Sequence, residues 1–321
     1  MRVSELSEDE IIAKLVNVLP QAANIVVPSG DDCAVLDFAY KTAISVDLLN
    51  ENVHFRTDWS TGYDVGYRAA TQNLADSVAM GALPRTLVVG LAFPSSTEME
   101  WLLDFAAGMR DACEPLGVGV DGGDLVSGEY ISISVTVLGD VEQPILRSGA
   151  QPGDLLIHTG VLGHGMAGLA LLEAGYTRET VEPELAALID DFLRPKPPLE
   201  TALAAAKAGN LTAMMDVSDG LIKDCRRIAH RSRVWIDIDD RALGKYLGDL
   251  GKAAGRVAAD RRHWLCEGGE DHGFLATMKA GTPVPDGFTV IGQVKGPDVD
   301  GRVSINGINY GAAGGWDHFH K

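Results

Sequence analysis

Strand-like and helix-like patterns alternate along the whole chain, and this mixture limits the possible fold more than any other feature. Residues 130–141 alternate apolar and polar side chains and form the clearest strand pattern. Residues 64–80 instead repeat apolar side chains at helical spacing, with Val65, Ala69 and Leu74 among the expected core positions. Because both patterns occur in both halves, the sequence predicts an α/β or α+β protein.

The remaining elements are assigned by the same reasoning. Further helices are expected at residues 8–19, 97–113, 166–173, 183–193, 199–208 and 220–231. Further strands are expected at residues 24–28, 42–46, 87–92, 117–120, 155–159, 212–216, 234–238, 274–278, 288–293 and 302–305. A stretch rich in Pro and Gly, Gln143 to Gly153, separates two halves of different charge. We therefore predict two domains, residues 1–142 and 143–321.

The chain of 321 residues has a formal net charge of −18, and the charge is unevenly distributed. Residues 1–142 hold 22 acidic and 7 basic side chains, whereas residues 143–321 hold 23 and 20. Nucleic acids and anionic membranes are bound by clustered Lys and Arg, so this composition argues against both as partners. Asp outnumbers Glu by 29 to 16. Asp prefers turns, helix caps and metal sites, so the positions of the aspartates are informative.

The N-terminus and the cysteines bear on the compartment. Residues Ser4–Glu10 begin a helix and do not resemble a basic and apolar leader. No apolar run approaches the roughly 20 residues of a membrane span. Four cysteines are scattered without a C-x-x-C motif, which fits reduced thiols. We therefore expect a cytoplasmic protein.

One common nucleotide motif is present but incomplete. Residues 163–168 read G-x-G-x-x-G between an expected strand and helix, as in a dinucleotide-binding fingerprint. The fingerprint also needs a second strand that ends in an acid about 20 residues later. Residues 179–191 are acidic and helical instead. Tight packing, or a helix N-terminus that faces phosphate, is the better interpretation.

Five acidic clusters share one pattern, in which a short apolar strand is followed by small residues and then by acid. They are Gly30-Asp31-Asp32, Ser45-Val46-Asp47, Gly122-Gly123-Asp124, Asp216-Val217-Ser218-Asp219-Gly220 and Gly268-Gly269-Glu270-Asp271. Asp76 adds an acid inside an expected helix. Strand ends carry ligand sites in α/β folds, and carboxylates and hydroxyls are the hard oxygen ligands that suit Mg²⁺.

Each cluster taken alone has a simpler explanation. A Gly-Asp pair is commonly a turn, and Asp216 and Asp219 could be part of the N-terminal cap of the helix at 220–231. Five repetitions of one pattern are harder to explain in that way. Many carboxylates repel one another unless cations lie between them. The set therefore points to several divalent cations and a polyphosphate that bridges them.

Five further residues lie near these clusters. His54 follows Asp47 on an expected loop and is a candidate for substrate contact, whereas Arg147 could bind phosphate or simply lie on a linker surface. Trp316 follows two glycines in a polar tail, as in a docked lid or a stacking platform. His164 and His272 lie in glycine-rich loops, and their roles stay open.

The ordered set of motifs resembles the thiamine-monophosphate kinase family, within the aminoimidazole-ribonucleotide-synthetase-like superfamily. The resemblance extends from about residue 25 to the end of the chain. It rests on the five clusters, on His54-Phe55-Arg56, on the run from Asn73 to Ala82, on Arg147-Ser148-Gly149-Ala150 and on Gly315-Trp316.

The resemblance implies an N-terminal mixed-sheet domain that binds ATP and magnesium and forms a homodimer, and a C-terminal α/β domain that completes the active site. It implies phosphoryl transfer from ATP to thiamine monophosphate. By motif position the implied magnesium ligands are Asp31, Ser45, Val46, Asp47, Asp76, Asp124, Asp216 and Asp219. The implied ATP contacts are Gly123, Asp124, Arg147 and Ser218, and the implied substrate contacts are His54, Glu270 and Trp316.

The chain departs from the family pattern at a few positions. Val46 stands where a hydroxyl residue is common, which leaves only a main-chain role, and Ala75 stands where Ser is frequent. Phe105 is a candidate for the aromatic residue that contacts ATP.

The acceptor itself predicts a mechanism. A phosphate monoester has a second pKa of about 6, so it is largely dianionic at pH 7 and needs no general base. Repulsion between two polyanions is the obstacle, and magnesium ions held by Asp relieve it. We therefore expect direct transfer without a phospho-enzyme. Two alternatives stay open: another ATP-dependent synthetase of the superfamily, and a non-catalytic protein that binds magnesium and nucleotide.

Overall fold

The computed structural model describes residues 1–29, 33–311 and 315, and these form two compact units. The first unit comprises Met1–Val78 and Ala82–Glu142, and the second comprises Ala79–Gly81 and Gln143–Lys321. Asp31 and Trp316 lie outside the described residues. In the described part of the chain, no helix is both long and apolar enough to cross a bilayer.

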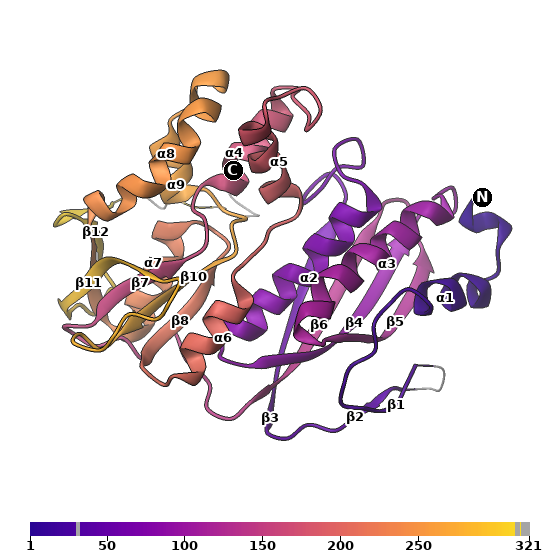
Figure 1. The fold of residues 1–321 in the computed structure, drawn as a ribbon, viewed down its shortest axis with the longest axis horizontal. Helices are drawn as coiled ribbons and strands as arrows, with labels where there is room; N and C mark the ends of the chain where they lie inside the picture. The colour runs from indigo at the N-terminus through magenta and orange to yellow at the C-terminus, as the bar shows by residue number, and fades with distance from the viewer. Residues whose placement is uncertain (30–32, 312–314, 316–321) are drawn as a thin grey trace. The chain divides into compact units, whose positions relative to one another are not determined.

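The first unit is a mixed four-stranded sheet with the order β3-β6-β4-β5 and a two-stranded hairpin, β1-β2 (Figure 1). Only β4 and β5 pair in parallel, because β5 follows β4 through a helix. The strands are β1 (Ile25–Val27), β2 (Val35–Leu36), β3 (Lys41–Asn50), β4 (Leu83–Phe93), β5 (Gly119–Ser127) and β6 (Ser132–Val141). The helices are η1 (Val3–Glu5), α1 (Glu8–Val16), α2 (Gly62–Ala79), α3 (Met99–Cys113) and η2 (Glu114–Leu116).

Glycines let α2 and α3 pack closely over one face of this sheet. A Cβ at Gly66 of α2 would lie 1.9 Å from the backbone oxygen of Phe105, and one at Gly108 of α3 would lie 2.1 Å from that of Tyr63. Phe105 is 3% exposed and stacks on Trp101, with 5.9 Å between ring centroids. Its side chain belongs to the core, so Phe105 is a wrong candidate for the ATP-contacting aromatic.

The second unit is a seven-stranded sheet with the order β13-β12-β9-β11-β7-β10-β8. The strands are β7 (Leu155–Thr159), β8 (Leu211–Val217), β9 (Val234–Ile238), β10 (Gly273–Met278), β11 (Thr289–Pro297), β12 (Val303–Ile305) and β13 (Ile308–Asn309). The helices are α4 (His164–Glu173), α5 (Pro183–Leu193), α6 (Leu199–Lys207), α7 (Leu221–Ser232), α8 (Asp240–Val257) and α9 (Arg261–Glu267). Helix α7 packs against β8, β9, β10 and β12, and α8 packs against β11, α4 and α9.

The expected mixture of helices and strands is confirmed, with two kinds of difference. Helices α8 and α9 were not expected from the sequence. Strands β3 and β5 are also longer than the expected ranges 42–46 and 117–120. Ser45, Asp47 and Asp124 therefore lie within strands, and the expectation that each acid follows a strand end is wrong for them. The same holds for Asp216, which is the penultimate residue of β8. The expectation is also wrong for Gly268-Gly269-Glu270-Asp271, which follow helix α9 and not a strand.

Candidate functional site

Ser45 and Asp76 form the first pair of oxygen ligands in the site. Ser45 is in β3 and Asp76 is in α2, and the Ser45 hydroxyl donates a hydrogen bond of 2.7 Å to Oδ2 of Asp76. Asp47 lies two residues after Ser45 and therefore faces the same side of the sheet. Val46 faces the other side and is 57% exposed. The structure thus groups three of the sequence-predicted ligands where the sheet meets α2.

Asp124 lies apart from this group. It belongs to β5, at the opposite edge of the sheet, about 14 Å from β3 because neighbouring strands lie about 4.8 Å apart. Asp124 pairs with Gly90 of β4. Gly90 also pairs with Ser134 of β6, which in turn pairs with Leu48 of β3. Residues in one such row point to the same face, so Asp124 shares the face of exposed Leu48. Next to it, a Cβ at Gly123 would lie 2.2 Å from the oxygen of Val89.

His54 is held at the end of β3. Its Nδ1 accepts a hydrogen bond of 2.9 Å from the backbone N–H of Asn50, the last residue of that strand. A neutral imidazole that accepts at Nδ1 carries its proton on Nε2. The ring is partly buried.

Two loops of the second unit are joined by main-chain hydrogen bonds. The N–H of Glu270 donates to the oxygen of Ser218 at 2.9 Å, and the N–H of His272 donates to the oxygen of Val217 at 2.9 Å. Glu270 and His272 adopt positive φ angles of 71° and 53°, which turn the second loop back toward the first. The structure therefore brings Asp216, Ser218, Asp219 and Glu270 together, although 50 residues separate the loops.

His272 bridges two carboxylates in this pair of loops, a role that the sequence left open. Its Nδ1 lies 3.6 Å from Oδ2 of Asp216, and its Nε2 lies 3.6 Å from Oε2 of Glu270. Burial opposes the charged ring, but Asp216 and Glu270 outweigh it and raise the pKa of His272 to about 10. The imidazolium thus offsets part of the acidic charge at neutral pH.

Asp271 explains the G-x-G-x-x-G motif. Its buried carboxylate accepts hydrogen bonds from the N–H groups of Gly163 and Gly165 at 2.6 and 2.8 Å, so it satisfies the N-terminus of α4. A Cβ at Gly168 would lie 2.2 Å from the oxygen of Leu188 in α5. The motif therefore serves tight packing. Beside it, His164 bonds Asp191 at 2.7 Å. Burial opposes the charged ring of His164, but Asp191 outweighs it and raises its pKa.

Helix α7 begins without the expected aspartate cap. Gly220 is the N-cap residue, and no side chain in the described chain caps the helix there, so the cap interpretation of Asp216 and Asp219 is wrong. Asp219 instead forms ion pairs with Arg227 and, at 3.5 Å, with Lys223. Asp224, inside α7, bonds the N–H groups of Ser218 and Asp219. Lys223, Arg226 and Arg227 lie at i, i+3 and i+4, and this spacing in the sequence indicates a cationic face of the helix.

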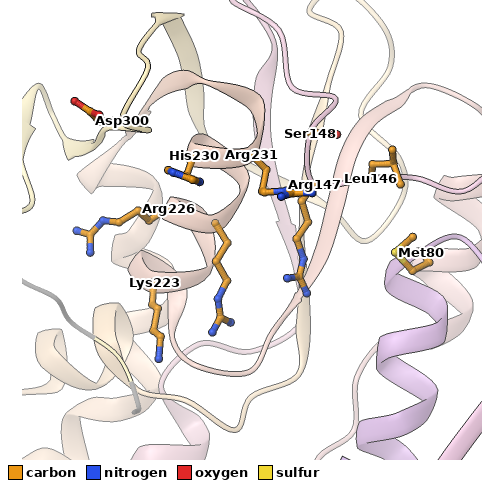
Figure 2. A pocket seen from close by; sticks show the side chains of 10 residues that line it. Met80, Leu146, Arg147, Ser148, Lys223, Arg226, His230, Arg231 and Asp300 are labelled. Carbon is orange, nitrogen blue, oxygen red and sulfur yellow. The ribbon is translucent and has the colours of Figure 1, made fainter. Parts of the chain in front are cut away.

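The same face of α7 lines a pocket of about 680 Å³ (Figure 2). Figure 2 shows Arg147 and Lys223 extending in the same direction from the linker and from the helix. The pocket concentrates cations in an otherwise acidic chain. Its lining residues are Met80, Leu146, Arg147, Ser148, Lys223, Arg226, Arg227, His230, Arg231 and Asp300.

The C-terminal tail reaches this region. A Cβ at Gly315, which has a φ of +110°, would lie 2.6 Å from the oxygen of Asp219 and 2.8 Å from Cβ of Lys223. Upstream, Arg226 donates to the oxygen of Tyr310 at 2.9 Å, and the Tyr310 hydroxyl donates to Glu267 at 2.6 Å. The residue before Trp316 is therefore placed against the acidic loop, although Trp316 itself is not described.

The oxygen groups fit magnesium that is carried by a nucleotide. In the described ranges, no group of three or more His, Cys, Asp or Glu side chains could hold a metal ion. Ser45 and Asp76 nevertheless present neighbouring hard oxygens, and so does the Asp216–Asp219 loop. Mg²⁺ is commonly held by one or two carboxylates together with substrate phosphates, and it keeps several waters. Such paired donors are the arrangement that this chemistry needs.

Comparison with known proteins places these residues in context. Residues 30–141 match the family model for the N-terminal domain of AIR synthase related proteins, and residues 151–299 match the C-terminal domain model. The chain is 38% identical to a thiamine-monophosphate kinase of Mycobacterium tuberculosis over 99% of its own length and 93% of the relative's. It is 34% identical to the Corynebacterium glutamicum enzyme over 99% of the chain and 95% of that enzyme.

A solved structure gives the same result for the fold. The structure described as AaThiL complexed with AMPPCP and TMP is similar with a TM-score of 0.79 and 32% identity, and the similarity covers 99% of each chain. Both the two-domain architecture and the family resemblance of the motifs are therefore confirmed.

Proposed function

Because the chain belongs to the thiamine-monophosphate kinase family and phosphorylates thiamine monophosphate with ATP, we propose that the transfer is direct and depends on magnesium. The observation that carries this proposal is local. Asp216, Ser218, Asp219 and Glu270 lie on two joined loops, and Asp219 contacts Lys223 and Arg227, which line the cationic pocket. A magnesium-polyphosphate ligand needs carboxylates for the metal ion and cationic side chains for the phosphates, and here the two kinds of group are neighbours.

The division of roles follows from charge. We assign the magnesium-binding role to the carboxylates and to Ser45, and when bound the ion would neutralise and align the phosphates. The assigned residues are Asp31, Ser45, Val46 through its main chain, Asp47, Asp76, Asp124, Asp216 and Asp219. Arg147 lines the pocket, where a guanidinium suits phosphate oxygens. Gly123, Asp124 and Ser218 complete the proposed nucleotide contacts.

Recognition of the acceptor is proposed for three residues. His54 is held at the end of β3 by the N–H of Asn50, and an imidazole N–H is a donor type that suits a phosphate oxygen. Glu270 is held by its backbone bond to Ser218 and suits the cationic thiamine ring. Trp316 follows Gly315, which lies against Asp219, and an indole ring suits stacking on an aromatic cation.

No residue is proposed as a general base, because the acceptor phosphate is already largely dianionic near pH 7. The chain's own contribution is to bind, to orient and to exclude water. The test measures ADP release from ATP with and without thiamine monophosphate. ADP release that depends on the acceptor supports the proposal, whereas binding of nucleotide without turnover favours a sensor. A phosphorylated protein that forms and decays during turnover would contradict direct transfer.

Asp124 gives a sharper test of the magnesium assignment. Asp124→Asn removes one charge and is expected to lower kcat/KM by at least about 10- to 100-fold and to raise the Mg²⁺ concentration needed for half-maximal rate. Asp104→Asn removes the same charge from an exposed position on α3 and serves as the matched control. An Asp124→Asn enzyme with the Mg²⁺ dependence of the control contradicts the assignment.

The open face of the first sheet supports a homodimer. Ile44, Val46 and Leu48 of β3 are 70%, 57% and 58% exposed, and Val88 and Val126 add to the same face. Exposed apolar patches of this kind mark association surfaces. Ile44→Glu combined with Leu48→Glu should halve the mass measured by ultracentrifugation, and an unchanged mass would contradict the assignment. We also propose a cytoplasmic location, where ATP is available.

A further inference from the structure

Asp224 is a fully buried acid that the proposed chemistry does not use. It lies in the first turn of α7, and its side chain has no exposed surface. A buried carboxyl group is costly unless polar partners compensate it. Its Oδ2 accepts hydrogen bonds from the N–H of Ser218 at 3.1 Å and from the N–H of Asp219 at 3.0 Å. The carboxylate therefore holds the main chain of two residues assigned to nucleotide and magnesium.

Arg227 extends this contact to a side chain. Its Nη1 lies 2.5 Å from Oδ1 of Asp224, and its Nη2 donates to Oδ2 of Asp219. The Arg227 guanidinium thus connects the carboxylate of Asp224, which holds the loop backbone, with the carboxylate of Asp219, which belongs to the loop. A planar guanidinium can serve two acceptors at fixed angles, which an ammonium group cannot do.

The same loop is fixed from its other side by main-chain contacts. The oxygens of Val217 and Ser218 accept from the N–H groups of His272 and Glu270, so the carbonyl groups are satisfied there. The N–H groups of Ser218 and Asp219 face α7, where Asp224 accepts them. Gly220 follows with a φ of +110°, and a Cβ there would lie 2.7 Å from the oxygen of Glu267. Asp224 thus supplies the acceptor on the helix side of a tightly constrained turn.

We propose that Asp224 and Arg227 are positioning residues for the nucleotide: Asp224 fixes the backbone of Ser218 and Asp219, and Arg227 fixes the direction of the Asp219 carboxylate. The inference rests on the proposed function of that loop. It explains why a charged residue occupies a buried helix position where an apolar residue would pack at lower cost.

The first experiment measures amide hydrogen exchange in the protein without ligands. In Asp224→Asn the amides of Ser218 and Asp219 should exchange at least about tenfold faster, since each loses the carboxyl oxygen that accepts its hydrogen bond. The matched control is Asp154→Asn, which alters another buried acid of the same unit that accepts the N–H of Gln151 at 2.9 Å and the Thr212 hydroxyl at 2.6 Å. Unchanged exchange at the two amides in folded Asp224→Asn would overturn the proposal.

The second experiment separates geometry from charge and does not depend on Asp224→Asn folding well. Arg227→Lys keeps the positive charge but cannot hold the carboxylates of Asp219 and Asp224 together. Arg227→Met removes the positive charge. Affinity for the non-hydrolysable nucleotide AMPPCP with Mg²⁺ should fall about tenfold or more in both variants, since each loses a charged hydrogen bond. Arg227→Lys with wild-type affinity would show that only charge matters and would overturn the positioning role.

Kinetics distinguish failure of this inference from failure of the proposed function. In a protein whose wild type phosphorylates thiamine monophosphate, Asp224→Asn and Arg227→Lys should raise KM for ATP far more than KM for thiamine monophosphate. If the wild type shows no phosphorylation of thiamine monophosphate, the proposed function fails, while hydrogen exchange and nucleotide affinity still decide the positioning role. Equal losses in Asp224→Asn and Asp154→Asn would reduce Asp224 to a general stability role and refute the inference.

Discussion

Protonation of His158 is expected to destabilise the fold as the pH falls below neutrality. His158 lies in β7 with no exposed surface, and its Nδ1 is 2.8 Å from the hydroxyl of Tyr246 in α8. Its Nε2 has no partner among the residues that the structure describes. Burial, and then the charge of Lys245, lower the pKa of His158 to about 3. The folded protein therefore holds this ring neutral throughout the mildly acidic range.

The size of the effect follows from linkage. An unfolded histidine has a pKa of about 6.5, so below that pH the unfolded chain binds a proton that the folded chain does not. Stability is unaffected by this residue above pH 6.5 and falls by about 1.4 kcal/mol for each pH unit below it. At pH 4.5 the loss is about 3 kcal/mol, a large part of the 5–15 kcal/mol that stabilises an ordinary domain.

Chemical denaturation at pH 7.5, 6.5, 5.5 and 4.5 measures this term in matched variants. Tyr246→Phe removes the hydroxyl partner, and Tyr246→Phe with His158→Leu removes the titrating ring as well. Other buried groups, such as Asp271 with its pKa raised by burial to about 6, contribute equally to both proteins. For each pH unit below 6.5, the free energy of unfolding of the double variant should therefore rise by about 1.4 kcal/mol relative to that of Tyr246→Phe. Identical pH slopes would refute the buried, neutral state of His158.

Three other substitutions test the packing and the site. Ser45→Ala removes the 2.7 Å hydrogen bond to Asp76 and should cost about 1 kcal/mol and weaken Mg²⁺ activation, measured by denaturation and by Mg²⁺ titration of the rate. Gly315→Ala places a Cβ 2.6 Å from the oxygen of Asp219 and should raise KM for thiamine monophosphate with little change in Tm. Gly66→Ala places a Cβ 1.9 Å from the oxygen of Phe105, and this overpacking should lower the free energy of unfolding by about 1–3 kcal/mol or more and lower Tm accordingly.

The sequence predicted elements well where side-chain spacing was regular. Val65, Ala69, Leu74 and Val78 recur at helical spacing, and all four are buried in α2. Helix α8 was missed although its buried residues also follow helical spacing. Its eighteen residues include glycines at 244, 248, 251 and 255, and each glycine lowers helix propensity by about 1 kcal/mol. Packing against β11, α4 and α9 overrides that local cost.

The strand limits failed for a related reason. Gly122-Gly123-Asp124 has the composition of a turn, yet it continues β5 as the parallel partner of Val88, Val89 and Gly90 in β4. Pairing with a strand that lies some 30 residues earlier in the chain cannot be read from local composition. Asp47 and Asp124 consequently lie within strands and Asp76 within a helix, and within the first unit Asp124 is separated from the other two acids and from Ser45.

The residue types of the site were predictable from the motifs, but their environment was not. Asp216 and Glu270 were both selected from the sequence, whereas His272, which lies between them, was left open. Its role depends on a contact with Asp216 across 56 positions and on burial, and neither is visible in local spacing. Asp224 was not selected, because an acid in the first turn of a helix is ordinary on a solvated surface.

The small net charge of residues 143–321 hides a local separation of charge that matters for phosphate chemistry. A region with little net charge could interleave acids and bases so that neither attracts a ligand. Here Asp216, Asp219 and Glu270 gather on two joined loops, while Lys223, Arg226 and Arg227 gather on the adjacent helix. Arg227 connects the two groups through Asp219 and Asp224. Magnesium would be held by the carboxylates of the loops, and phosphate by the cations of the adjacent helix. A ligand that brings both ions satisfies each group at once, which neither free Mg²⁺ nor free phosphate does.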